Sequence, residues 1–401
     1  MKKHILFVAA KDHTISRCRQ LGIDCSLIQL SYLHTPYQST ECRQYHELAL
    51  TQPEMALADN VDKAIELAAK IHAEHPIDAV VTFLEFTQEA TAAIAKKLNI
   101  ATNIDEKAMA LTRCKLNMRA CFAASNLNTI PYARVDSLET LRTFFLNQAH
   151  PVIVKPAQGA ASKGVNLVRY ESELAAAFAN SSDNNTAEVI VESFIDSPHE
   201  FSVESLSLDG HHEIIAYTAK TTQGESNFVE VGHVQPAQID ADLKQIISEQ
   251  VVSLLYTIGH LNGPAHTELR VKNGIPYIIE TQLRIGGDQI WEMTELTSGR
   301  SQISETLAHL VNIPAPAPTA TFDAAAIRFV MPETIQIEQC PDISGYQADN
   351  LRLELETTAD WQKKARATHS GERLGYCLAT GSSVSEVLKK INTCFDTLKF
   401  H

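Results

Sequence analysis

Short apolar runs alternate with amphipathic stretches through the first hundred residues. Continuous apolar runs of this length are typical of buried strands, and apolar side chains at helical spacing indicate helices between them. Strands are expected at 5–9, 25–30 and 78–83, and helices at 14–21, from Asp59 or Asn60 to about 72, and at 85–98. This alternation predicts a parallel α/β sheet. No Gly-x-Gly-x-x-Gly accompanies it, so the pattern does not indicate a dinucleotide site.

The pattern changes after residue 104 to helices mixed with strand–turn–strand units, so the middle of the chain is predicted to be α+β. Asp105 is expected to cap one long helix that runs to about residue 125. Asp209-Gly210 and Asn273-Gly274 each stand between strand-like runs and predict hairpin turns. Further strands are expected at 189–191, 201–208, 325–331, 351–356 and 375–379, and further helices at 243–261 and 384–398. A Pro-rich stretch at 313–318 precedes the last unit.

Composition narrows the class of protein. The chain has 401 residues, enough for about two to four packed units. A formal net charge of −14, with no run of more than two Lys or Arg residues, argues against a nucleic-acid partner. Eight cysteines occur without a Cys-x-x-Cys pair, so reduced thiols are expected in place of a zinc site. No stretch reaches the ~20 apolar residues of a membrane span, and the N-terminal run is too short for a signal peptide, so we expect a cytoplasmic protein without membrane contact.

A lysine at the end of a buried strand precedes a loop with two glycines. Lys155 ends the apolar run in Pro151-Val-Ile-Val-Lys-Pro156 and must find an anion or reach solvent. The loop Gly159-Ala-Ala-Ser-Lys-Gly164 has small residues that let backbone N–H groups approach phosphate oxygens, although it is not a Walker A loop. A flexible surface turn beside a solvated lysine explains the same residues. The pair alone does not decide between these interpretations.

Two glutamates follow at the ends of predicted strands. The apolar run at 189–191 leads into Glu192 and could present backbone groups to an adenine edge. Glu200 can accept hydrogen bonds from ribose hydroxyls, each of which is a donor. Exposed glutamates at strand ends are the alternative interpretation.

A predicted hairpin has more charged and amide side chains on one face than is usual for a strand with a purely structural role. Glu280, Gln282 and Arg284 share parity, so their side chains leave one face of the strand. Oxygen ligands of this kind suit Mg²⁺ between ATP phosphates, and the arginine can hold a transferring phosphoryl group. A strict two-residue turn at Asn273-Gly274 would leave Glu268 and Glu280 on opposite faces. We therefore predict an odd-numbered loop, with the glycine in a left-handed bulge position, which returns both glutamates to one face.

Taken in order, these segments resemble the ATP-grasp superfamily, most closely its L-amino-acid ligase branch. The resemblance covers about residues 78–312 and extends more weakly over both ends. It implies an ATP-grasp fold of class α/β and α+β, with an N-terminal parallel-sheet, Rossmann-like domain and a C-terminal α+β subdomain. The implied divisions are 1–104 for the pre-ATP-grasp domain, 105–186 for grasp subdomain A, 187–312 for grasp subdomain B and 319–401 for the C-terminal subdomain.

The resemblance also implies which residues bind the nucleotide. In such enzymes two lysines bind the ATP phosphates, a loop of small residues covers them, a hinge contacts adenine and a glutamate binds the ribose. The matching residues are Lys115 and Lys155 for the phosphates, Gly159, Ser162, Lys163 and Gly164 in the loop, Glu192, Phe194 and Ile195 in the hinge, and Glu200 for the ribose.

Metal, catalytic and substrate residues follow from the same resemblance. Arg284 matches the family's arginine that steadies the acyl phosphate. Glu268, Glu280 and Gln282 match its metal ligands, and Gln282 stands where the family has asparagine. The implied substrate residues are Glu230, His233, Gly286, Gly287 and Asp288, with Trp291 shaping the same pocket. A helix cap at Asp288 and core packing of Trp291 are the alternatives.

The activity implied by the resemblance is an ATP-dependent carboxylate–amine ligase that joins amino acids through an acyl phosphate. ATP and Mg²⁺ or Mn²⁺ would be the cofactors. The partners would be small molecules, an amino-acid carboxylate and an amine acceptor, and the family leads us to expect a homodimer. Two alternatives stay open: another ATP-grasp ligase or carboxylase with a different carboxylate, and a non-catalytic ATP-binding regulator of the same fold.

Overall fold

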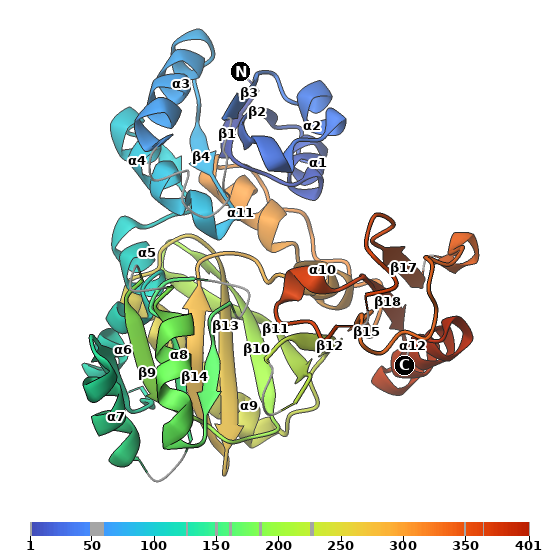
Figure 1. Cartoon of the computed structure of the whole chain (residues 1–401). Helices are drawn as coiled ribbons and strands as arrows, with labels where there is room; N and C mark the ends of the chain where they lie inside the picture. Colours follow the sequence, from blue (N-terminus) through green and yellow to red (C-terminus); the bar gives the residue numbers. More distant parts are fainter. Residues whose placement is uncertain are drawn as a thin grey trace.

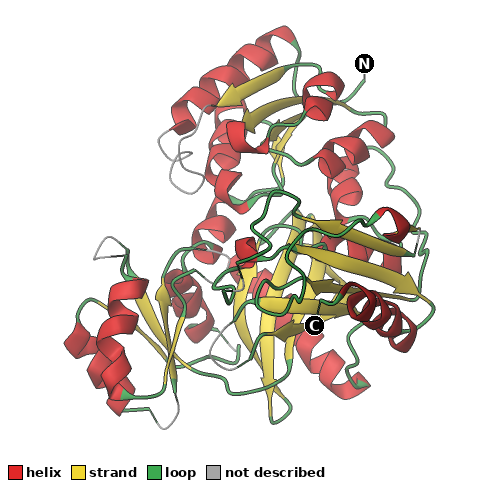
Figure 2. Cartoon of the chain, turned by 45° about the vertical axis from the view of Figure 1, so that its right-hand side comes forward, coloured by secondary structure: helices red, strands yellow, loops and turns green. Residues whose placement is uncertain are grey.

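A computed structural model of the chain arranges its strands in three sheets (Figures 1 and 2). The residues described are 2–48, 60–125, 127–148, 151–159, 163–183, 187–224, 228–348, 350–363 and 365–400. The predicted cap at Asp59 therefore lies outside the described residues. Within these ranges, none of the helices combines the length and apolar character that crossing a bilayer requires.

The N-terminal sheet is parallel, as the alternating pattern predicted. Its order is β3-β2-β1-β4-β5, and each neighbouring pair is parallel. The strands are β1 (His4–Val8), β2 (Asp24–Leu30), β3 (Tyr45–Leu48), β4 (Ala79–Val81) and β5 (Ala101–Thr102). The helices are α1 (Asp12–Gln20), α2 (Pro36–Glu41), α3 (Val61–Glu74) and α4 (Gln88–Leu98), with short 3₁₀ turns η1 (Ser31–Leu33) and η3 (Glu85–Thr87). Asn99 ends α4 in a left-handed conformation, as a C-cap asparagine is suited to do.

The predicted long helix at 105–125 is wrong, because the chain breaks it into two. Asp105 caps α5 (Glu106–Thr112), and α6 (Lys115–Ala123) begins after an extended residue, Cys114. The break lets the backbone N–H of Lys115 donate to the carbonyl of Ala157 at 2.8 Å. Helical periodicity runs on through the sequence here, but this contact directs the first turn of α6 toward the neighbouring sheet.

That neighbouring sheet is small and antiparallel, with order β6-β9-β7-β8. Its strands are β6 (Tyr132–Val135), β7 (Val152–Pro156), β8 (Asn166–Val168) and β9 (Val189–Ser193). Two helices that we did not predict belong to this unit, α7 (Leu138–Leu146) and α8 (Leu174–Ser181), with the 3₁₀ turn η4 (Glu171–Glu173) before α8. The side chains of α7 and α8 share one apolar core with the strands, so both helices cover the sheet.

The third sheet has nine strands in the order β14-β13-β10-β11-β12-β15-β18-β17-β16. They are β10 (Glu200–Leu208), β11 (His211–Thr222), β12 (Glu230–Gln235), β13 (Gly263–Lys272), β14 (Ile275–Gln282), β15 (Ala324–Phe329), β16 (Gln347–Ala348), β17 (Leu351–Leu355) and β18 (Gly375–Gly381). The helices of this region are α9 (Ala241–Ile258), α10 (Ile290–Ser298), α11 (Gln302–Leu310) and α12 (Val384–Leu398), with 3₁₀ turns η5 (Ser344–Tyr346) and η6 (Ser370–Glu372). The C-terminal strands therefore continue the sheet that begins with the β13–β14 hairpin, through the pairing of β12 with β15.

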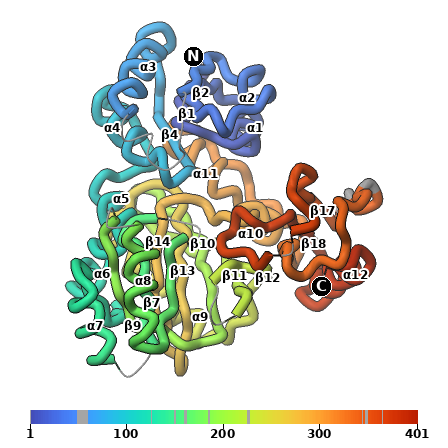
Figure 3. Tube along the Cα trace, viewed as in Figure 1, coloured from blue at the N-terminus to red at the C-terminus, as the bar shows by residue number. Residues whose placement is uncertain are grey.

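Packing joins the sheets. Helix α11 returns to the N-terminal sheet (Figure 3). There Ile303 and Leu307 share an apolar core with Ile5 and Phe7. Helix α9 packs with α5 and α6 against β10, β13 and β14 in the largest core cluster. These contacts fix loops of the N-terminal sheet beside one face of the nine-stranded sheet. The four domain boundaries proposed above stay predictions.

The β13–β14 hairpin has a different turn from the one predicted, yet Glu268 and Glu280 still lie on one face. Asn273 and Gly274 form a clean two-residue turn with φ of 53° and 75°, and Lys272 pairs with Ile275. The predicted odd-numbered loop is therefore wrong; this dipeptide supplies the positive φ values that a tight hairpin needs. Register shifts instead between Glu268 and its neighbour, so that Glu268 pairs with Glu280. The extra residue is a bulge within β14, and the two glutamates do share a face.

Candidate active site

Two pockets meet at a shared wall of three glutamates. The first, which we call the hinge pocket, lies between the four-stranded sheet and β13–β14. The second, which we call the interface pocket, lies between loops of the N-terminal sheet and the nine-stranded sheet. Glu230, Glu268 and Glu280 line both. The two pockets are therefore neighbours, and these three carboxylates form part of the boundary between them.

The two predicted phosphate lysines both line the hinge pocket. Lys155, at the end of β7, lies 2.7 Å from Glu192, yet burial outweighs this partner and lowers the pKa of the lysine. Lys115, at the start of α6, donates to the carbonyl of Gly159 at 3.1 Å and lies 3.3 Å from Glu280. Burial alone would lower the pKa of Lys115, but the carboxylates of Glu280 and Glu85 outweigh it and raise the value. Two cations from different elements therefore converge where a polyanion could bind.

The glycine loop borders the same pocket through Gly159 and Lys163. Gly159 and Gly164 have φ of 136° and 72°, which L side chains rarely adopt. A Cβ on Gly164 would also meet Pro156 Cγ at 3.0 Å, so the loop returns tightly against the end of β7. Ser162, the other predicted loop residue, lies outside the described residues.

Glu192 lies near the end of β9 and lines the hinge pocket. This carboxylate is buried and ion-paired to both Arg119 and Lys155, at 2.8 and 2.7 Å. These partners outweigh the effect of burial and lower the pKa of Glu192 to about 2. Phe194 and Ile195, which follow the end of β9, line the pocket, although the Phe194 N–H already donates to the Pro151 carbonyl at 2.8 Å. The apolar hinge surface is therefore present, and beside it the Glu192 carboxylate forms ion pairs with Arg119 and Lys155.

Glu200 reaches the hinge pocket from the first residue of β10. It accepts two hydrogen bonds from Arg270, at 2.9 and 2.7 Å. The Arg270 guanidinium lies over the rings of Phe194 and Phe228, 5.2 and 5.5 Å from their centroids. Arginine thus fixes the orientation of the predicted ribose glutamate.

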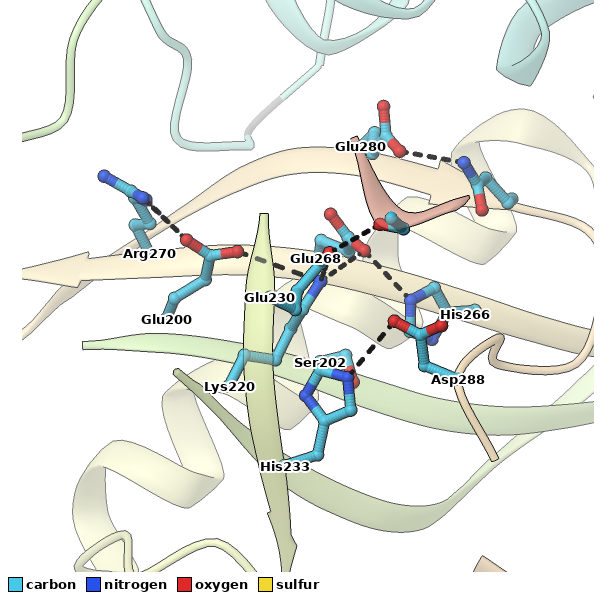
Figure 4. A network of polar contacts seen from close by, with 12 residues as sticks. Glu200, Ser202, Lys220, Glu230, His233, His266, Glu268, Arg270, Glu280 and Asp288 are labelled. Atoms are coloured by element: carbon cyan, nitrogen blue, oxygen red, sulfur yellow. Dashed lines mark hydrogen bonds and ion pairs between the residues drawn. The ribbon is translucent and has the colours of Figure 1, made fainter. Parts of the chain in front are cut away.

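Strand register places the charged residues in rows on one face of the large sheet (Figure 4). Cross-strand neighbours at one level project together. The first row holds His233, Lys220, Glu200 and Arg270; the second holds Ser202, Glu268 and Glu280; the third holds Glu204, His266 and Gln282.

Lys220 forms ion pairs with three carboxylates on this face, and the sequence did not lead us to predict it as a site residue. Its buried ammonium lies 2.6 Å from Glu268, 3.4 Å from Glu230 and 3.8 Å from Glu200. Burial opposes the charge, but the three carboxylates raise its pKa well above the ordinary value. The clue in the sequence was a lysine that follows the largely apolar run at 214–219, since a buried ammonium must meet anions.

His266 is the second residue that the sequence analysis missed. Its ring nitrogens lie 2.9 Å from Glu204 and 3.1 Å from Glu268. Burial opposes protonation, but the two carboxylates raise the pKa of His266 to about 9. Lys220 and His266 together hold the pKa of the Glu268 carboxyl well below its usual range, although burial alone would raise it.

The donor set fits a divalent cation that takes further ligands from phosphate. Glu268 and Glu280 face each other across the hairpin, and Gln282 Nε2 donates to Glu280 at 2.8 Å. The Oε1 atom of Gln282 is buried and has no hydrogen-bond partner among the described residues. Within those residues no group of three or more His, Cys, Asp or Glu side chains forms a metal-binding cluster. Two carboxylates and an amide oxygen suit Mg²⁺, which commonly uses one or two protein carboxylates together with substrate phosphates.

Arg284 lies beyond the hairpin in the interface pocket. Its Nη1 donates to the carbonyl of Ile285 at 2.8 Å, and its Nε lies 3.5 Å from Glu85 of the N-terminal unit. The following Gly286 has no room for a side chain, because a Cβ would meet Ile290 Cγ2 at 2.7 Å and Glu204 Oε2 at 2.9 Å. Gly287 is not constrained in this way, since the nearest atom is 3.9 Å away.

Asp288 is held by a residue far along the chain. Arg373 donates to both of its oxygens, at 2.8 and 2.5 Å, and His233 Nε2 lies 3.6 Å away. Burial would raise the pKa of Asp288, but these two partners lower it. The alternative that Asp288 caps the helix is wrong, because the residue before α10 is Gln289. No local pattern in the sequence indicated Arg373.

Residues of the N-terminal unit, among them His13, also line the interface pocket. Trp291 stacks on His13, with ring centroids 4.0 Å apart and an interplanar angle of 19°, and Arg17 lies over its ring at 4.7 Å. Burial lowers the pKa of His13 to about 3, so this imidazole is neutral. Trp291 therefore both packs against α1 and lines the interface pocket.

Comparisons with known proteins agree with this geometry. A model of the ATP-grasp domain matches residues 148–292, and a model of the ATP-grasp N-terminal domain matches residues 16–102. Alanine–anticapsin ligase of Bacillus subtilis is 27% identical over 256 residues, which is 58% of this chain and 53% of that protein. Dapdiamide A synthase of Enterobacter agglomerans is 24% identical over 313 residues, 76% of this chain and 71% of that protein.

The fold is also that of solved structures. An L-amino acid ligase from Bacillus licheniformis superposes with a TM-score of 0.79 at 22% identity, covering 98% of this chain and 97% of that one. By sequence, the alignment spans only about half the length of the alanine–anticapsin ligases.

Proposed function

Since the chain belongs to the ATP-grasp superfamily, we propose that it is an ATP-dependent carboxylate–amine ligase of the L-amino-acid ligase type. It would join two amino acids and convert ATP to ADP and phosphate. The observation that carries the proposal is the shared wall: Glu230, Glu268 and Glu280 line both the pocket that contains Lys115 and Lys155 and the pocket that contains Arg284. A ligase needs such a boundary, because phosphoryl transfer joins its nucleotide site to its acid site.

ATP is assigned to the hinge pocket. Adenine would lie on the apolar hinge at Phe194 and Ile195, with the ribose hydroxyls toward Glu200. The phosphates would extend to Lys115 and Lys155, which line the same pocket. Glu268, Glu280 and Gln282 would hold Mg²⁺, which neutralises phosphate charge as it develops in the transfer.

The acid substrate is assigned to the interface pocket. One of its carboxylate oxygens attacks the γ-phosphorus of ATP; a P–O bond forms to the carboxylate while the bond to the β-phosphate oxygen breaks, giving an acyl phosphate and ADP. Arg284 faces this pocket and can hold the transferring phosphoryl group with its planar donors. Lys220, fixed among three carboxylates, adds positive charge at the boundary.

The second step consumes the acyl phosphate. An amine attacks the acyl carbon, phosphate leaves, and the amine loses one proton. Glu230 lies at the boundary with a hydrogen bond from Ser370 at 3.2 Å, and it is the carboxylate we assign to orient the amine. The acidic set Glu230 and Asp288 suits an ammonium group, and His233 is buried beside it.

The test measures phosphate release from Mg-ATP against a panel of single amino acids and amino-acid pairs, with product identification by mass spectrometry. Release that requires a pair of amino acids, together with a new amide of the expected mass, would support the proposal. Release stimulated by another carboxylate would move the assignment to a different ATP-grasp ligase. ATP binding without release under any of these conditions would refute the enzyme assignment.

A further inference from the structure

Arg119 is a buried residue that takes no part in the two reaction steps of the proposed function. It lies on α6 one turn after Lys115, so the two side chains leave the same face of the helix. Lys115 reaches Glu280 at 3.3 Å. Arg119 donates from Nη1 to the carbonyl of Ile278 at 2.8 Å and from Nη2 to the carbonyl of Ile279 at 2.7 Å. Helix α6 therefore holds one short segment of β14 with two cations.

That segment is the bulge that sets the register of the two metal glutamates. Leu269 pairs with Ile278 and Glu268 pairs with Glu280, so Ile279 is the residue without a partner of its own. A bulge turns backbone carbonyls out of the ladder, and a buried carbonyl without a donor is costly. The guanidinium supplies two donors at a fixed spacing, which a lysine ammonium at the end of a flexible chain cannot match.

The third donor of Arg119 leads to the phosphate lysine. Its Nε donates to Glu192 Oε1 at 2.8 Å, and Glu192 Oε2 lies 2.7 Å from the Lys155 ammonium. Arg119 and Glu192 are both buried. One side chain thus connects the register of Glu280 with the position of Lys155, across two different sheets.

We propose that Arg119 is a positioning residue, which fixes the bulge so that Glu280 faces Glu268 and so tunes the affinity of this carboxylate pair for the metal. The proposal rests on the proposed function, because it takes Glu268 and Glu280 as the residues that hold Mg²⁺. Loss of the guanidinium fork would let β14 return to regular alternation, which places Ile279 opposite Glu268.

The test is calorimetric and needs no turnover. The affinity for ADP is measured with excess EDTA and with saturating Mg²⁺, and the ratio of the two affinities gives the metal-dependent gain. In Arg119→Lys this gain is expected to fall about tenfold, the equivalent of one lost charge-assisted hydrogen bond, while the EDTA value changes less. Arg134→Lys is the matched control, because Arg134 pairs with Glu188 at the exposed surface of the same subdomain. It should leave both affinities unchanged.

The outcomes separate the two ideas. A wild-type protein whose affinity for ADP does not respond to Mg²⁺ would overturn the proposed metal site, and this assignment with it. A normal wild-type response that Arg119→Lys retains would overturn the role of Arg119 alone. Equal losses with and without Mg²⁺ would also overturn it, since they indicate general damage.

A second variant keeps the proposal testable if Arg119→Lys does not fold. Glu192→Gln removes the charge beside Lys155 but leaves both Arg119–carbonyl bonds in place. The EDTA affinity is expected to change, because Lys155 loses its partner, while the gain from Mg²⁺ persists. Loss of that gain in Glu192→Gln would overturn the assignment of register control to Arg119.

Discussion

Replacing Lys220 by methionine removes a cation that lies 2.6 Å from Glu268, 3.4 Å from Glu230 and 3.8 Å from Glu200. After the change Glu268 keeps His266 at 3.1 Å and Glu200 keeps Arg270 at 2.7 Å. Among the described residues, Glu230 keeps a hydrogen bond from Ser370 and no cation. One partly buried carboxylate therefore loses its cation, and breaking a buried pair on one side costs about 3 kcal/mol, the lower end of the usual range because the other two keep partners.

Equilibrium unfolding in urea tests this cost. With a dependence on urea of about 3 kcal/mol per molar, the unfolding midpoint of Lys220→Met should fall by roughly 1 M. Lys96→Met is the matched control, because Lys96 also pairs with a glutamate, Glu106 at 3.0 Å, but both side chains are exposed. Its midpoint should not move measurably. A Lys220 variant as stable as the Lys96 variant would refute the argument that the buried ammonium holds the three carboxylates together.

Three further outcomes follow from the site. Arg284→Ala should leave ADP affinity nearly unchanged in calorimetry but lower turnover at least about 100-fold, as removal of a charge-stabilising donor does; turnover near the wild-type rate would refute its catalytic role. His266→Gln should remove a pH-dependent part of stability. The pKa of His266 is raised to about 9, so its ion pairs with Glu204 and Glu268 are complete below about pH 6.5 and are lost as pH rises through 9. The stability difference between wild type and this variant in urea titrations should therefore shrink across that interval; a constant difference would contradict the assignment. Arg373→Ala should raise KM for an amino-acid substrate and leave KM for ATP unchanged, because Arg373 orients Asp288 in the interface pocket; equal increases in both would contradict the separation of the pockets.

Local patterns predicted the elements that local forces determine. Strand–helix alternation gave the parallel N-terminal sheet, and the predicted helix at 384–398 has the bounds of α12. The prediction of one helix at 105–125 was wrong. The break before α6 lets the Lys115 N–H donate to the Ala157 carbonyl, and helical periodicity carries no information about such a distant contact. Asn273-Gly274 forms the two-residue turn that this dipeptide favours, and the extra residue that brings Glu268 opposite Glu280 lies within β14 instead of in the loop.

The candidate site shows the same division. Carboxylates on one hairpin could be found from their parity and spacing. Their cations could not, because Lys220 lies on β11 and meets Glu268 only when β10 lies between β11 and β13. Arg373 meets Asp288 only after the chain has passed through β15, β16 and β17, which lie between the two residues in the sequence. Ion pairs between distant segments depend on strand order, which no local pattern states.

The continuity of the nine-stranded sheet bears on how the protein can be divided. Strand β12 carries Glu230 and His233, and its other neighbour is β15, the first strand after the Pro-rich stretch. A fragment that stops at residue 312 would expose the β12 edge, with its row of unpaired N–H and C=O groups, to pairing with other molecules. It would also lack Arg373 and Ser370. We expect such a truncation to aggregate during expression. Because Ser370 and Arg373 contact Glu230 and Asp288, the C-terminal part also belongs to the candidate active site and is not a separable appendage.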